Sequence, residues 1–262
     1  MAAAIVFVVS LFFLSEGGFD WRNDIAPAAR AWWPEPWVFG FPQAPWAAAI
    51  VFPIANLPDR LATAFTNGIC MLVLAAVARK YRGPEWSAIL VYLSPPGFSF
   101  FVNGQTEWLV LLGLTFYNGL DPILLLIKPQ VAAGVLLPRL IRAGDSWKTY
   151  IVPGAIFVVL SLVVWPLWPV RLWQSFSPVL IGSEWNASAW PWGIAVGVVL
   201  LWIAYRTRDD FWGVVASPFL FPYVNWPSYL GLLIVVAARW PRMFAIGWVL
   251  MWVLGAAFFY LV

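Results

Sequence analysis

Two carboxylates, Asp20 and Asp24, follow the first apolar segment of the chain, with Arg22 between them. Residues four positions apart share one face of a helix, so the two acids meet if this stretch is helical. A carboxylate at the edge of an apolar region has a raised pKa, which suits a general base. The pair therefore predicts a site that removes a proton from a hydroxyl group. The plainer alternative is a solvated loop whose charges end the apolar segment.

Further polar residues interrupt the apolar central part of the chain. Gln105 and Glu107 belong to an Asn-Gly-Gln-Thr-Glu turn, and Lys128 and Gln130 to a Lys-Pro-Gln turn. Ionisable groups within apolar segments are costly unless they are paired, and they mark candidate functional sites. Glu107, Asp121 or an anionic lipid phosphate would each satisfy Lys128, and so would extension of its side chain to the headgroups. The first turn has a plain alternative as well, an ordinary Asn-Gly turn.

A proline-rich turn, Phe41-Pro42-Gln43-Ala44-Pro45-Trp46, leads into another apolar run. Two prolines around a turn restrict how the chain enters the following segment. The chain has no histidine and a single cysteine, Cys70, so imidazole-based catalysis and intrachain disulfides are excluded. We find no Gly-rich phosphate loop, paired-cysteine metal site or serine hydrolase motif, and nothing that predicts a nucleic-acid partner.

The elements that position these residues are apolar helices. Of 262 residues, 63% are hydrophobic and 10% charged, and the mean hydropathy is +0.82, whereas soluble domains carry roughly 25% charged residues. The apolar residues form continuous blocks, and only helices or closed barrels cross a bilayer, at about 20 residues per helix. We therefore expect an all-α, polytopic transmembrane protein that forms a single domain over residues 1–262.

The apolar blocks predict about eight full crossings plus short re-entrant or interfacial helices. Met1–Leu14 is expected to be a retained first span. Prolines are expected to interrupt or end several blocks, at Pro53, Pro58, Pro129, Pro138, Pro166 and Pro227. The blocks are 1–14, 45–57, 61–78, 86–102, 106–127, 128–142, 149–170, 191–205, 211–224, 228–238 and 244–262.

Basic residues predict the orientation, because cytoplasmic turns are rich in Lys and Arg. Residues 45–57 then lie in the interface or re-enter, and residues 106–127 form a hairpin that dips in and returns. The loops 15–44 and 171–190, with the turns at 103–105 and Asn225, fall on the outer face. The basic turns hold Arg79, Lys80 and Arg82; Arg139, Arg142 and Lys148; Arg206 and Arg208; Arg239 and Arg242.

The order of these motifs resembles the GT-C superfamily of membrane glycosyltransferases, and most of all the polyprenol-phosphate-mannose-dependent mannosyltransferases of bacterial envelopes. An acid after the first span, a proline-containing turn, an Asn-Gly-Gln turn and a Lys-Pro-Gln turn follow one another. The turn Gln43-Ala44-Pro45 replaces the usual Tyr-Pro-Pro turn of this family. The resemblance covers residues 1–142, a catalytic module with the outer loop 15–44, and leaves residues 143–262 as variable C-terminal helices.

This resemblance implies an inverting enzyme in the bacterial inner (plasma) membrane, with its site facing outward. It would move mannose, or another hexose or pentose, from a polyprenyl-phosphate donor to an acceptor. Asp20 would be the general base, with Asp24 as the neighbouring alternative. Lys128, Arg22 or Arg171 would stabilise the departing phosphate. The substrate-binding set is Arg22, Gln105, Glu107, Lys128, Gln130 and Arg171.

Cofactor use and partners stay open at this stage. Asp20, Asp24 and Glu107 offer oxygen ligands for a divalent cation, or they hold none. A transporter or lipid flippase is the first competing reading, although such proteins often contain internal repeats, and we find none here. A non-catalytic membrane subunit that works with a partner chain is the second.

Overall fold

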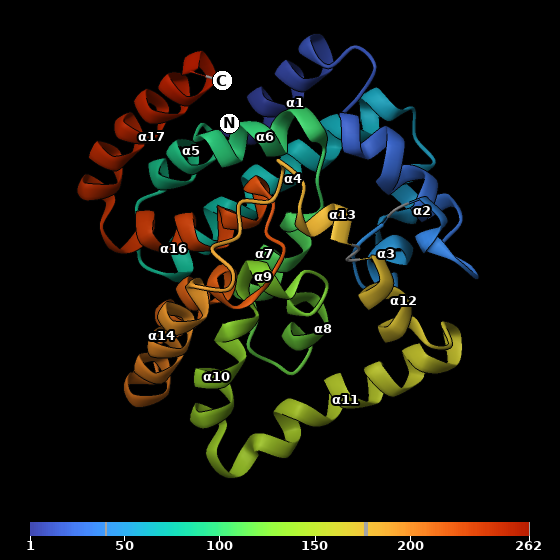
Figure 1. Ribbon diagram of the computed structural model, residues 1–262, viewed down its shortest axis with the longest axis vertical. Coiled ribbons are helices and arrows are strands. Elements are labelled where there is room, and N and C mark those ends of the chain that lie inside the picture. Colours follow the sequence, from blue (N-terminus) through green and yellow to red (C-terminus); the bar gives the residue numbers. More distant parts are fainter. Residues whose placement is uncertain (40, 176–177, 262) are drawn as a thin grey trace.

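The computed structural model describes residues 1–39, 41–175 and 178–261, and these residues form helices without any strand. The prediction of an all-α chain is therefore confirmed for the described part. Figure 1 shows α17 at one edge of the molecule and α11 at another, with α4, α7 and α9 between them.

The first half of the chain contains the helix α4 and the shorter elements that surround it. Their bounds are α1 (Ala2–Phe13), the π-helical turn η1 (Trp21–Ile25), α2 (Ala26–Arg30), η2 (Pro36–Phe39), α3 (Pro45–Ala55), α4 (Asp59–Lys80), α5 (Trp86–Tyr92), α6 (Pro95–Asn103), α7 (Glu107–Thr115) and α8 (Asp121–Leu125).

The second half begins with a bent helical run and continues with helices joined by short turns. Its elements are α9 (Pro129–Ala132), η3 (Ala133–Val135), α10 (Leu136–Ala143), η4 (Gly144–Ser146), α11 (Trp147–Val164), α12 (Trp168–Ser175), α13 (Pro178–Ile181), α14 (Gly193–Thr207), α15 (Asp210–Ala216), η5 (Ser217–Leu220), η6 (Trp226–Tyr229), α16 (Leu230–Arg239) and α17 (Pro241–Leu261).

Helix α4 is the central element, and it packs against α1, α5, α7 and α16. Its 22 residues extend over about 33 Å, close to the thickness of a bilayer core. Among the described residues, two helical stretches are long and apolar enough to cross a membrane, Asp59–Lys80 and Pro129–Val164. The second is bent, since α10 and α11 meet at an angle (Figure 1). These stretches indicate membrane association.

Several boundaries differ from those expected. Residues 86–102 form two helices, because the hydroxyl of Ser94 caps α6 by accepting a bond from the Gly97 amide and Pro95 takes the first helical position. Pro53 does not end α3, and Pro138 lies within α10, near its start, where its missing N–H costs little. Much of the loop 171–190 is helical, in α12 and α13.

Candidate functional site

A cavity of about 570 Å³ opens where the two halves of the chain meet. Residues 19–130 supply a polar wall together with Phe19 and Phe41, and residues 180–227 supply further aromatic side chains and an amide. The lining polar residues are Asp20, Asp24, Gln43, Ser99, Asn103, Gln105, Lys128, Gln130 and Asn225, and the lining aromatic residues are Phe19, Phe41, Trp185, Tyr223 and Trp226.

Close backbone contacts hold the segment that carries Asp20. The amide of Gly18 donates to the Thr63 hydroxyl of α4 at 2.8 Å. A Cβ atom on Gly18 would lie 2.5 Å from the carbonyl oxygen of Asn103, so only glycine allows this approach. The segment is thereby fixed to α4, one turn from its Asp59 end, and to the turn that precedes α7.

Asp20 and Asp24 both line the cavity, because the chain from residue 19 to residue 30 is helical and includes the π-helical turn η1. Such π-helical turns occur frequently at functional sites. Trp21, fully buried, anchors this turn to the core. The helical conformation that Asp20 and Asp24 need in order to share one face is therefore present.

The surroundings of the carboxylates favour their protonated forms. Burial, and then the charge of Asp24, raise the pKa of Asp20 to about 6, while Lys128 and the bond from Gln105 act in the opposite direction. Burial also raises the pKa of Asp24. A carboxyl with a pKa near 6 is charged at neutral pH and still basic enough to accept a proton.

Four side chains form a continuous hydrogen-bonded series from Asp20 to Glu107. The amide nitrogen of Gln105 donates to Asp20. The ammonium of Lys128 donates to Oε1 of Gln105 at 2.9 Å and to Oε1 of Glu107 at 2.7 Å. Lys128 and Glu107 are almost completely buried, with side-chain exposures of 4% and 0%. The partner of Lys128, left open by the sequence, is Glu107.

This series leaves Lys128 able to bind one more acceptor. A lysine ammonium has three N–H donors, and two are used by Gln105 and Glu107. Lys128 lines the cavity, so its third donor is available to an oxygen atom of a bound molecule. Gln130 lines the same wall, and Gln43, also buried, accepts a bond from the Thr106 hydroxyl at 2.5 Å.

The structure does not bring every expected residue into the cavity. Arg22 pairs with Glu16 at 2.7 Å, and the exposed Arg171 lies 3.8 Å from Glu35. Neither arginine lines the cavity. Glu107 lies behind Lys128 and is also outside the lining, so its contact with a bound molecule would be indirect.

Two features of this arrangement were missed from the sequence. The first is the aromatic wall with Trp185, Tyr223 and Trp226, which comes from segments that the sequence left as a variable region. The second is Arg139, expected in a cytoplasmic turn but fully buried. The only sequence signal for Arg139 was its place within the apolar block 128–142, 18 residues after the acid Asp121.

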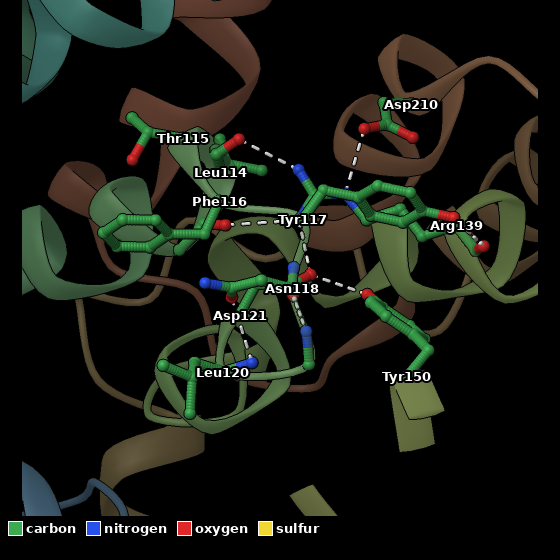
Figure 2. Close-up of polar contacts among 12 residues, drawn as sticks. Leu114, Thr115, Phe116, Tyr117, Asn118, Leu120, Asp121, Arg139, Tyr150 and Asp210 are labelled. Atoms are coloured by element: carbon green, nitrogen blue, oxygen red, sulfur yellow. Dashed lines mark hydrogen bonds and ion pairs between the residues drawn. The ribbon is translucent and has the colours of Figure 1, made fainter. Parts of the chain in front are cut away.

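Arg139 is satisfied by a group of polar partners at the far end of α7 from the cavity. It lies 2.6 Å from Asp121 and 3.0 Å from Asp210, and it donates to the carbonyl oxygen of Leu114 at 2.9 Å. Figure 2 shows Arg139 reaching both carboxylates, with the Tyr150 hydroxyl also directed at Asp121. Because Asp121 is used here, it is not a partner of Lys128.

Among the described residues, no group of three or more His, Cys, Asp and Glu side chains is placed to hold a metal ion. Glu107, the third oxygen donor expected for such a site, is engaged by Lys128.

Neither a protein-family model, nor a curated protein sequence, nor a solved structure matches this chain. The assignment of function therefore depends on the geometry and chemistry of the cavity.

Proposed function

We propose that this chain is a GT-C-type membrane glycosyltransferase, which transfers a sugar from a polyprenyl-phosphate donor to an acceptor with inversion at the anomeric carbon. One observation carries the proposal: a basic carboxylate, Asp20, and a buried ammonium, Lys128, are held in one cavity by the same amide, that of Gln105. Transfer from a lipid phosphate needs a base and a cation at a fixed separation.

Asp20 serves as the general base. In the transfer, the acceptor oxygen forms a bond to the anomeric carbon and its proton passes to the Asp20 carboxylate. The bond between the anomeric carbon and the phosphate oxygen breaks, and the phosphate leaves with the electron pair. The pKa of Asp20, about 6, is close to the pH at which a base of this kind works best.

Lys128 stabilises the phosphate as charge develops on it. Its third N–H is the available donor, and burial strengthens its electrostatic effect because water screens little at such a site. The cavity wall carries two acids, Asp20 and Asp24, against this one cation. Such a balance accommodates the singly charged phosphodiester of a polyprenyl-phosphate sugar better than the diphosphate of a nucleotide sugar.

The site is proposed to face the outer leaflet of a bacterial inner membrane. Gly18 binds Thr63 near the Asp59 end of α4, whereas Arg79 and Lys80 occupy the opposite end. Basic residues favour the cytoplasmic side, so the cavity lies outside. The chain is proposed to cross the membrane about eight times, with short helices such as α3 and α8 only partly inserted.

Purified protein in liposomes tests this proposal directly. The liposomes contain a synthetic polyprenyl-phosphate hexose or pentose, and release of polyprenyl phosphate and formation of glycoside are measured together. We expect equal amounts of both products, and no transfer from nucleotide sugars. Failure to bind or consume any member of a donor panel with mannose, glucose, galactose and arabinose would refute the proposal and favour a transport or subunit role.

A further inference from the structure

Two loops of the C-terminal half present exposed indole rings to the cavity. Trp185 lies between α13 and α14, and Trp226 begins η6. Both side chains line the cavity, yet 66% and 48% of their surfaces remain exposed. Because these two indoles line the pocket, they offer apolar ring faces that a bound ligand can cover.

The side-chain amide of Asn186 cross-links these two loops through hydrogen bonds. Its amide nitrogen donates to the carbonyl oxygens of Ile181 at 2.7 Å and Pro222 at 2.9 Å, and its oxygen accepts from the amides of Ser188 and Val224 at 3.0 and 3.1 Å. The sequence pattern Asn186-Ala187-Ser188 matches a glycosylation acceptor, but here the amide serves as a cross-link.

Further bonds join the same loops on either side of Asn186. The amide of Ala187 donates to the Val224 carbonyl at 2.8 Å, and the Ser188 hydroxyl donates to the Phe221 carbonyl at 2.6 Å. The Tyr229 hydroxyl donates to the Ala187 carbonyl at 2.7 Å. These bonds hold the two loops that carry Trp185 and Trp226 together before any ligand binds, and such preorganisation of the backbone reduces the entropy lost on binding.

Polar groups lie beside the two indoles. The Ser228 hydroxyl donates to Oδ1 of Asn225 at 2.5 Å, which directs the amide N–H groups of Asn225 to other acceptors. Asn225 lines the cavity, as does Asp24 on the wall that also carries Asp20. An aromatic face next to amide and carboxylate groups matches a pyranose ring, whose C–H face is attracted to the π-system and whose hydroxyls need hydrogen bonds.

We propose that Trp185, Trp226 and Asn225 form the acceptor subsite and that the acceptor is a saccharide. This inference rests on the proposed function, and it places a saccharide hydroxyl within reach of Asp20. The C-terminal loops therefore determine which acceptor is used, while the first half of the chain holds the base and the phosphate-binding lysine.

Kinetics with saccharide acceptors test the subsite. Trp226→Ala and Trp185→Ala should each raise the acceptor KM about tenfold and leave the donor KM unchanged, and Trp226→Tyr should recover part of the affinity. Trp173→Ala is the matched control, since Trp173 is 76% exposed on α12 and does not line the cavity. An unchanged acceptor KM in both alanine variants overturns the inference.

Binding without a donor separates this inference from the proposed function. Saturation-transfer NMR with methyl glycosides and disaccharides of mannose, glucose and galactose should detect binding to the wild-type protein, and binding should be lost in Trp226→Ala. A protein that transfers sugar but shows no difference between these two forms retains the proposed function without the subsite. A protein that binds the saccharides but transfers nothing loses the proposed function while keeping the subsite.

Discussion

Asp20 and Lys128 contact opposite ends of a single amide, that of Gln105. The amide nitrogen donates to Asp20, and the amide oxygen accepts from Lys128 at 2.9 Å. One rigid planar group thus fixes the separation of a carboxylate and an ammonium that come from distant parts of the chain. In the proposed reaction, the acceptor hydroxyl meets Asp20 and the donor phosphate meets Lys128 at that separation.

Replacement of Lys128 should weaken donor binding and destabilise the fold together. Lys128→Met leaves Glu107 as a buried charge without its partner, which costs about 3–5 kcal/mol. It also removes the only cation that lines the cavity among the described residues. Thermal unfolding and the donor KM measure the two effects.

The double variant Lys128→Met/Glu107→Gln separates binding from stability. It removes both charges of the pair, so we expect most of the lost stability to return while donor binding stays weak. Recovery of donor affinity in the double variant would show that Lys128 stabilises the fold and does not bind the donor.

The rate of transfer should depend on pH through Asp20. The base works as the carboxylate, so the rate rises with pH, reaches half its maximum near pH 6 and is level above pH 7. Initial rates between pH 4.5 and 8 with saturating donor measure this profile. A rate that is flat from pH 5 to 8 contradicts it.

Two neighbouring substitutions should move the midpoint of that profile in opposite directions. Asp24→Asn removes a negative charge that raises the pKa of Asp20, so the midpoint falls. Gln105→Leu removes a hydrogen bond that favours the charged form, so the midpoint rises. Shifts of the same sign in both variants would exclude Asp20 as the titrating group.

Arg139 should matter for stability far more than the other basic turn residues. Arg139→Met leaves Asp121 buried without a counter-charge and costs about 3–5 kcal/mol. Arg79→Met breaks an exposed pair with Glu85 and costs about 0–1 kcal/mol. Thermal denaturation in the same detergent compares the two variants, and similar losses would contradict the structural role of Arg139.

Thiol labelling tests the proposed orientation. In a Cys70→Ala background, Glu16→Cys and Glu85→Cys place exposed thiols near opposite ends of α4. A membrane-impermeant maleimide applied to intact cells should label position 16, and position 85 only after permeabilisation. Labelling of both positions from outside would contradict a membrane crossing by α4.

The sequence predicts the helical class and the polar wall of the cavity, because both depend on local signals. Continuous apolar blocks permit only helices, and acids or lysines within them must find partners. It does not select the partner of Lys128, since Glu107 and Asp121 satisfy the same charge rule. Only packing assigns Glu107 to Lys128 and Asp121 to Arg139.

The aromatic wall and the positions of Arg22 and Arg171 depend on tertiary contacts. Trp185 is one of 20 tryptophans, and nothing in its neighbours distinguishes a cavity wall from a headgroup anchor. Arg171 pairs with Glu35 because α12 lies near η2, a proximity without local sequence signal. The start of α6 could have been predicted from Ser94 and Pro95, since Ser-Pro is a typical helix start.

The transfer rate of Asp20→Asn tests the central claim most directly. The variant should fold at least as stably as the wild type above pH 6, because the native state disfavours the charged form of Asp20. The matched control is Glu16→Gln, an exposed acid of the same loop that pairs with Arg22. We predict a rate lower by about 10²–10⁴-fold for Asp20→Asn and an unchanged rate for Glu16→Gln. Transfer by folded Asp20→Asn within a few-fold of the wild-type rate would contradict the account.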